Sequence, residues 1–183
     1  MRVMLKSNCI AMACVIIFAS TSAMANGPVL DTNLSIFEDL IGKQWEGHFE
    51  DDDESMTLYM NWEPILDGAA VQMNGSSSSS DMTRRNIYYF DRAKNLVTFL
   101  AMTSNGYVGT GTVSLQDSVL IFLGQQVWPD GSVHDTESQW EFLSEGNVRV
   151  IAGHKILYTP VDSKQGQATE TRPYDIKIES QGG

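Results

Sequence analysis

The chain is almost without cysteine. Cys9 and Cys14 are its only two, and both lie near the amino terminus of a sequence of 183 residues. From residue 15 onward the chain can form no disulfide, and it offers no thiol nucleophile and no thiolate metal site. This part of the chain must therefore fold without cysteine chemistry of any kind.

Long hydrophobic runs are missing as well. The longest, residues 10–19, is too short for a membrane-spanning helix of about 20 residues. It follows Arg2 and Lys6 and precedes Ala23-Met24-Ala25, which places small residues three and one positions before Asn26. This order is typical of a cleaved secretory signal. We therefore expect residues 1–25 to be a signal peptide and the protein to be exported, periplasmic or secreted, with no integral membrane span.

An alternative makes Cys14 the lipid-carrying residue of an exported lipoprotein. The preceding Ala11-Met12-Ala13 lacks the leucine-like residue that such sites favour, and the apolar run continues past Cys14. The sequence therefore favours cleavage before Asn26.

Basic residues are scarce. The chain has 12 Lys and Arg against 23 Asp and Glu, which gives a net charge of −11, and removal of Arg2 and Lys6 with the signal would make it −13. Binding to nucleic acid or to an anionic membrane needs a basic face, so neither partner is expected. The remaining residues, 26–183, are enough for a single domain.

Short alternating segments separated by turn residues fill most of the chain. In residues 44–50, Trp45, Gly47 and Phe49 share one side, as a half-buried strand requires. We predict strands at 44–50, 56–62, 69–73, 83–90, 96–103, 107–114, 119–128, 133–142, 148–158 and 174–178. A short helix capped by Asn33 and ended by Gly42 precedes them, and the serine-rich residues 75–80 are expected to form a loop.

Nearly all these strands are joined by two to five residues, so neighbours in sequence should be antiparallel neighbours in space. About ten such strands would expose two raw edges unless the sheet closes. We therefore predict an all-β fold, an antiparallel up-and-down barrel of about ten strands with the short helix across one end. A two-layer sandwich is the main alternative, and a transmembrane barrel is a weaker one because the strands lack an outward apolar band.

The stretch Leu40-Ile41-Gly42-Lys43-Gln44-Trp45-Glu46-Gly47 is similar to the opening of calycin-type, lipocalin-like barrels, where a glycine and a tryptophan enter the first strand. The spacing here is G-x-x-W, whereas the lipocalin form is G-x-W. Residues 62–68 and Tyr89-Phe90-Asp91 also resemble uncharacterised bacterial exported lipocalin-like domains. The resemblance implies a central cavity for a small apolar molecule, and an arginine, Arg149 or Arg172, that covers Trp45.

Several side chains are candidates for ligand binding. Methionines make a soft, adaptable apolar surface, and His134 shares a strand face with Thr136, Ser138 and Trp140. The predicted ligand-binding residues are Trp45, Phe49, Met60, Met73, His134, Trp140 and His154. No metal site is predicted, because the three histidines lack metal-binding spacing. No catalytic residue is predicted either, and a serine nucleophile is disfavoured because the chain has no G-x-S-x-G elbow. No cofactor is expected either, although the resemblance to nitrobindin-like barrels makes haem bound through His154 an alternative.

The sequence thus favours an exported binding protein for a small apolar or amphipathic molecule over an enzyme. One alternative is a lipocalin-fold enzyme that uses His134 or His154 as acid or base. Another is a structural or interaction domain with a filled core. A binding protein needs a cavity of roughly 300 Å³ or more, whereas the enzyme needs one of these histidines within hydrogen-bond reach of a carboxylate.

Overall fold

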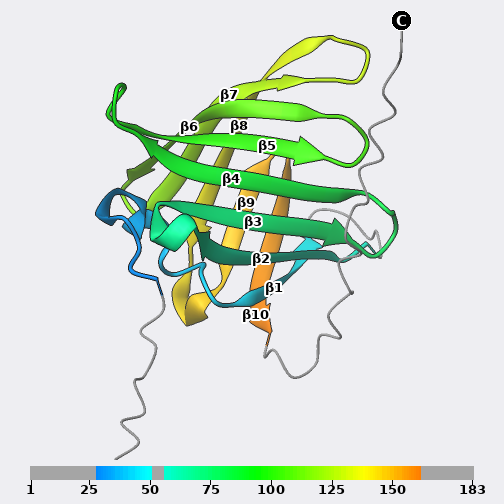
Figure 1. Cartoon of the computed structure of the whole chain (residues 1–183). Coiled ribbons are helices and arrows are strands. Elements are labelled where there is room, and N and C mark those ends of the chain that lie inside the picture. The colour runs from blue at the N-terminus through cyan, green and yellow to red at the C-terminus, as the bar shows by residue number, and fades with distance from the viewer. Residues whose placement is uncertain (1–27, 51–55, 162–183) are drawn as a thin grey trace, which may run out of the picture.

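Ten antiparallel strands close into one barrel in this computed structural model, which describes residues 28–50 and 56–161 (Figure 1). The strands follow one another round the ring in chain order, and the last pairs with the first. The predicted barrel is confirmed, and the sandwich alternative is wrong. The predicted signal peptide and the predicted strand at 174–178 lie outside the described residues.

The strands are mostly eight to ten residues long and are joined by short turns. They are β1 (Gln44–Phe49), β2 (Leu58–Ile65), β3 (Ala70–Ser77), β4 (Thr83–Asp91), β5 (Leu96–Thr103), β6 (Val108–Gln116), β7 (Val119–Val127), β8 (Val133–Phe142), β9 (Val148–Ala152) and β10 (His154–Val161). Three short 3-10 helices, η1 (Thr32–Phe37), η2 (Leu66–Gly68) and η3 (Ser144–Gly146), complete the described elements.

The predicted strand at 148–158 is in fact two strands, β9 and β10, which turn at Gly153. Gly153 has a φ of 78°, a left-handed conformation that favours glycine. Ala152 and His154 are direct partners across this turn, so both face the same side of the sheet. The alternating pattern therefore continues through the turn without a break, and for this reason periodicity did not reveal it.

The first part of the predicted serine-rich loop (75–80) is also different from the prediction, because it forms a strand. Residues 75–77 belong to β3 and pair with β2 on one side, and Gly75 and Ser76 pair with β4 on the other. The backbone hydrogen bonds of two neighbouring strands hold this polar segment in the sheet, although it has few side chains to bury.

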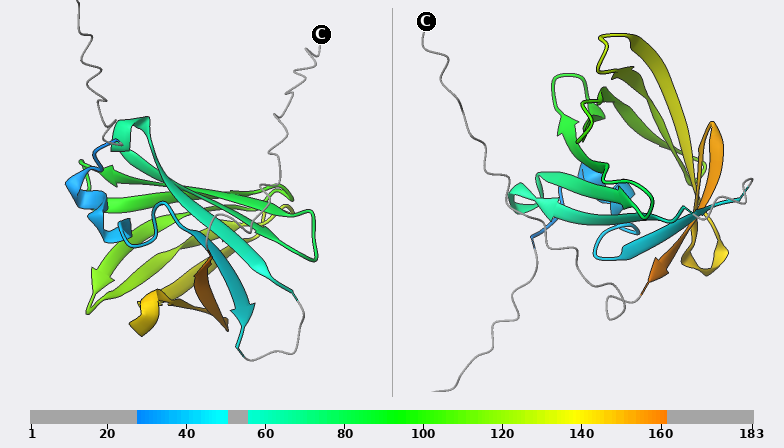
Figure 2. Two further views of the ribbon diagram at one scale, coloured as in Figure 1. Left: turned by 90° about the horizontal axis from the view of Figure 1, so that it is seen from below. Right: turned by 90° about the vertical axis from the view of Figure 1, so that its right-hand side faces the viewer.

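Helix η1 lies at one end of the barrel, the left end in Figure 1, where β3 and β5 begin. Its cap is Asp31, whose carboxylate accepts a hydrogen bond from the backbone N–H of Asn33 at 2.9 Å, so the prediction of Asn33 as the cap is wrong. Leu34, Phe37 and Leu40 are completely buried and close this end of the barrel. The opposite end faces the viewer in the right panel of Figure 2.

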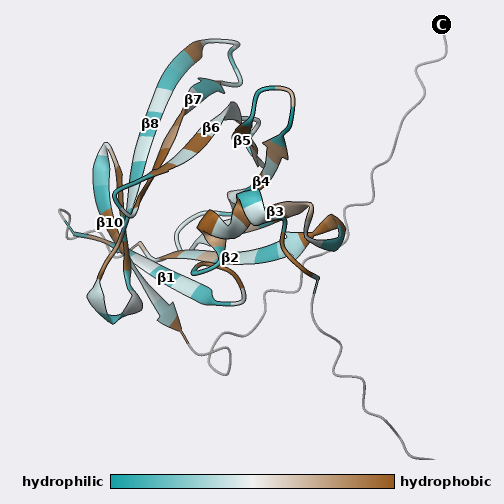
Figure 3. Cartoon of the chain, turned by 90° about the vertical axis from the view of Figure 1, so that its left-hand side faces the viewer, coloured by the Kyte–Doolittle hydropathy of each residue, from teal (hydrophilic) through white to brown (hydrophobic). Residues whose placement is uncertain are grey.

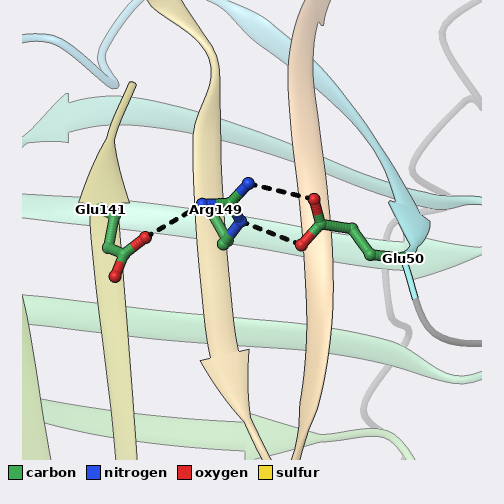
Figure 4. Close-up of polar contacts among 3 residues, drawn as sticks. All are labelled: Glu50, Glu141 and Arg149. Carbon is green, nitrogen blue, oxygen red and sulfur yellow. Dashed lines mark hydrogen bonds and ion pairs between the residues drawn. The ribbon is translucent and has the colours of Figure 1, made fainter. Parts of the chain in front are cut away.

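The closing seam of the barrel is the place where the last strand, β10, pairs with the first. Two ion pairs lie on the outer face beside it. Arg149 on β9 donates to Glu50, just after β1, at 2.9 and 3.2 Å, and to Glu141 on β8 at 3.3 Å (Figure 4). These three residues span β10, the strand that pairs with β1 to complete the ring. The carboxylates, Glu50 first, raise the pKa of Arg149. The seam is therefore braced by side chains as well as by backbone hydrogen bonds.

We expect Arg149→Gln to lower the melting temperature, because it removes both ion pairs, of which the one with Glu50 crosses the seam. The difference from the wild type should shrink in 1 M NaCl, since salt screens exposed charges. Arg92→Gln is the matched control, because Arg92 forms a single ion pair of 3.6 Å and its side chain is 83% exposed. Thermal unfolding at low and high salt measures both variants. Equal melting temperatures for the two would contradict a bracing role.

Candidate functional site

The inner face of the barrel follows from the strand register and the burial pattern. Buried residues alternate along most of the strands, as in β2, where Met60 and Trp62 point inward and Tyr59 and Glu63 point outward. Figure 3 shows this alternation as repeated changes between hydrophobic and hydrophilic colour along the strands. We call the half of the interior next to η1 the closed half, and the opposite half, around Gly75, Arg84, Gly109, Gly124 and Thr136, the open half.

The closed half is filled by aromatic rings. Trp62 stacks on Tyr88 with ring centroids 5.0 Å apart, and it meets Trp140 edge-on at 5.5 Å. Phe37 from η1 packs on both Trp62 and Tyr88, and Phe122 packs against Trp140 at 5.2 Å. Such contacts leave no room for a ligand, so this half is a packed core. We call this packed layer of rings the aromatic floor.

The inner face of the open half is lined by small side chains. Gly75, Ala101, Gly109 and Gly124 lie there on four different strands. A Cβ atom added at Gly75 would meet nothing closer than 3.6 Å, and one at Gly109 nothing closer than 3.5 Å. Gly124 is packed more closely, since an added Cβ would lie against the Thr110 carbonyl and 3.0 Å from the ring of Phe99. Gly75 and Gly109 therefore leave space at their Cβ positions, whereas Gly124 does not.

This space is open to solvent rather than enclosed, because Arg84 and Thr136 face inward and are nevertheless exposed. A depression of about 440 Å³, lined by Leu123, Gly124, Asp135, Thr136 and Glu137, lies on the β7–β8 pair. Leu123, Asp135 and Glu137 face outward, so this depression is on the outer side of the sheet and is separate from the interior space.

A chain of polar side chains runs along the inner face of β4, from the mouth to the floor. The Arg84 guanidinium donates through Nε to Asn86 Oδ1 at 2.9 Å, and Asn86 donates to the Tyr88 hydroxyl at 2.8 Å. Asn86 and Tyr88 are 2% and 1% exposed. Burial raises the pKa of Tyr88 to about 12, against the effects of Arg84 and Asn86, so its hydroxyl stays protonated at neutral pH.

Tyr158 on β10 also faces the interior of the barrel. Its ring lies over Gly47, where an added Cβ would clash with it, and it stacks parallel to Trp140 with centroids 6.4 Å apart. Burial raises the pKa of Tyr158 to about 12, and the charge of Arg84 acts in the opposite direction. Arg84 therefore influences tyrosines on two separate strands, β4 and β10.

The acidic side chains of the described strands are confined to the outer face of the sheet. Arg84, His134 and His154 occupy inward positions. Every acidic residue within the described strands occupies an outward position; these residues are Glu46, Glu63, Asp91, Asp135, Glu137 and Glu141. In a chain of net charge −11, the inner face of the described strands thus carries basic and neutral groups only.

Four of the predicted ligand-binding residues lie in the packed interior. Trp45 is 1% exposed and donates through Nε1 to the Leu40 carbonyl at 3.1 Å. A depression beside it holds about 170 Å³, less than a ligand site needs. Met60, Met73 and Trp140 are 5%, 4% and 8% exposed. Their burial agrees with a structural role in the floor, and ligand contact by these side chains stays a prediction.

The other three predicted residues, Phe49, His134 and His154, lie at the rim of the open half. His154 meets the ring of Phe49 edge-on at 5.9 Å, and His134 packs on Trp128 at 4.6 Å. His134 Nε2 is 3.1 Å from the Ser132 hydroxyl. Neither histidine is hydrogen-bonded to a carboxylate in the described part of the chain, so the contact that acid–base catalysis by His134 or His154 requires is not formed there.

The side chain that lies over Trp45 is not the arginine that the resemblance implied. Arg149 points outward to its two carboxylates, so its assignment to Trp45 is wrong, and Arg172 lies outside the described residues. Lys43 takes this place instead, with Nζ 5.4 Å from the centre of the indole and bonded to the Asp39 carbonyl at 2.8 Å. A cation still lies over the indole, but it comes from the turn before β1.

Sequence analysis missed Arg84, Asn86, Tyr88 and Tyr158. The first three alternate along the predicted strand 83–90, so a polar run on the face that also carries Tyr88 was visible in the sequence. That this face points inward was not visible, because Arg85 and Tyr89 alternate in the same way on the opposite face.

No protein-family model matches the chain, and no curated protein shows significant similarity to it. Within residues 28–50 and 56–161, no three His, Cys, Asp or Glu side chains are grouped as metal ligands would be. None of the helices in the described ranges has the length and apolar character needed to cross a membrane.

Proposed function

We propose that the protein is an exported, calycin-type binding protein that holds a small amphipathic molecule in the open half of its barrel. The observation that carries this proposal is the division of the interior. Aromatic rings fill one half, whereas glycine and alanine line the other and expose polar groups to it. A barrel with a filled core would bury its inward positions, whereas Arg84, His134 and Thr136 face inward and are exposed.

The enzyme alternative is less well supported. It needs a histidine next to a carboxylate in the hollow, and the carboxylates of the described strands point outward. Haem bound through His154 also fits poorly, because this side chain is exposed at the tip of the β9–β10 turn and lacks an enclosing apolar pocket. Binding without chemistry therefore accounts best for the arrangement.

Native mass spectrometry of the protein purified from its own compartment, with an absorbance scan, tests the proposal for the natural ligand. We expect a co-purified small molecule. The neutral dye N-phenyl-1-naphthylamine, which fluoresces in apolar surroundings, tests the hollow directly. A bare mass together with no fluorescence gain from this dye or from its anionic analogue would overturn the proposal, and a haem absorption band would favour the cofactor alternative.

We expect Thr136→Trp to weaken dye binding about tenfold or more, because the added indole would occupy the mouth of the hollow. Thr136 is exposed and faces inward opposite Gly124. Thr110→Trp is the matched control, since Thr110 on β6 is equally exposed but faces outward. Dye titration with both purified variants measures the effect. Equal losses in the two variants, or none in either, would show that the dye binds outside the barrel.

A further inference from the structure

Arg84 has a positive charge without a counterion in the described part of the chain. The ion pairs found there involve Arg92, Arg149, Lys94 and His48, but not Arg84. Its side chain makes one hydrogen bond, through Nε to Asn86. A guanidinium has five N–H donors in a fork that matches an anion, so most of the donor capacity of Arg84 is unused within the described residues.

The Tyr158 hydroxyl has no partner among the described residues either. Every fully buried side-chain nitrogen or oxygen there has a hydrogen-bond partner, and no such bond involves this hydroxyl. The hydroxyl must therefore reach open space, although Tyr158 as a whole is only 9% exposed. Tyr88 is similar, since its hydroxyl accepts a bond from Asn86 but donates none to the described residues. The Tyr158 hydroxyl is therefore available to donate a hydrogen bond to a molecule in the open half.

We infer that the bound molecule carries an anionic group, which binds between the Arg84 guanidinium and the Tyr158 hydroxyl while its apolar body lies against the small residues of the open half. This inference rests on the proposed function and adds the chemical class of the ligand. The absence of carboxylates from the inner face of the described strands favours an anion over a cation there, because a cation would meet Arg84 with nothing to offset the repulsion.

Two dyes with the same apolar body separate the head group from the rest. The dye 8-anilino-1-naphthalenesulfonate carries an anion that N-phenyl-1-naphthylamine lacks. We expect the anionic dye to bind the wild type more tightly by roughly tenfold or more, the usual gain from a hydrogen-bonded charge. Decanoate and decyl phosphate should displace it at lower concentration than decanol, and the better of these two identifies the preferred head group.

Arg84→Gln should weaken binding of the anionic dye roughly ten- to a hundredfold and leave the neutral dye unaffected. Arg85→Gln is the matched control, because Arg85 is the next residue on β4, is also exposed, and points outward to Asn74. Tyr158→Phe should cost the anionic dye roughly three- to tenfold, since it removes one donor and keeps the ring over Gly47. Tyr89→Phe, at an outward position that is 43% exposed, is its control.

The outcomes distinguish a failure of the anionic-ligand inference from a failure of the proposed binding function. If both dyes bind equally and Arg84→Gln acts no differently from Arg85→Gln, the protein is a binding protein but the anionic head group is wrong. If neither dye binds the wild type, the proposed function fails and the inference fails with it. Selective loss of the anionic dye in Arg84→Gln, with circular dichroism unchanged, supports both.

Discussion

Replacement of Trp45 by alanine is expected to lower the free energy of unfolding by about 3 to 5 kcal/mol, as truncation of a buried tryptophan usually does. Trp45 is 1% exposed, and its indole N–H bonds to the Leu40 carbonyl in the turn that joins η1 to β1. The change would leave a cavity at the closed end and free a buried acceptor. Urea unfolding followed by circular dichroism measures the loss.

Trp128→Ala is the control for this prediction. Trp128 follows β7 at the rim, is 41% exposed, and contacts Tyr107 and His134. Its removal is expected to cost about 1 kcal/mol or less, because little area is buried and the cavity stays open to water. A stability of Trp45→Ala equal to that of Trp128→Ala would mean that the first strand does not lie where the structure places it.

Gly111→Ala should be at least as damaging as many core truncations, with a loss of about 3 kcal/mol or more. A Cβ at Gly111 would lie against the Leu123 carbonyl and only 2.6 Å from the Cα of Gly124, its partner on β7. It would also meet the ring of Phe99 at 2.7 Å. Two of these contacts are with backbone, which cannot move aside without opening the β6–β7 pairing.

Gly109→Ala, two residues earlier on the same strand and the same inner face, supplies the comparison. Its added Cβ would lie 3.5 Å or more from its neighbours, an ordinary contact, so the expected change is within about 1 kcal/mol of zero. Thermal and urea unfolding of the two variants side by side measure the contrast. Similar stabilities for both would show that β6 and β7 do not approach each other as closely as described.

Much of the fold was predictable because strand periodicity and turn residues are local signals. The segments 96–103 and 133–142 match β5 and β8 to the residue, and closure into a ring follows from the cost of free edges. The turn at Gly153 was not predictable in this way, since the alternation of residues continues across it. The η1 cap was misassigned for a related reason, because Asp31 and Asn33 are both good caps and tertiary contacts chose between them.

The candidate site was predicted less well. Phe49, His134 and His154 were placed correctly on the inner side, but Trp45, Met60, Met73 and Trp140 belong to the floor beneath the hollow. A strand pattern tells which residues share a face, and it does not tell how far along the barrel each one lies. Position along the barrel depends on the stagger between strands, which separates filled layers from open ones.

The chain alone was sufficient to establish an all-β, cysteine-free fold with an acidic surface, because alternation, turn residues and charge can be read along the sequence without knowledge of contacts. Only the folded structure could decide that Arg84, Asn86 and Tyr88 form a hydrogen-bonded chain on the inner face. The same holds for Tyr158, which faces this interior from a strand six positions further along the chain. Which face of β4 points inward is set by closure of the whole ring. A site formed across such a ring therefore arises from long-range packing that no local pattern encodes.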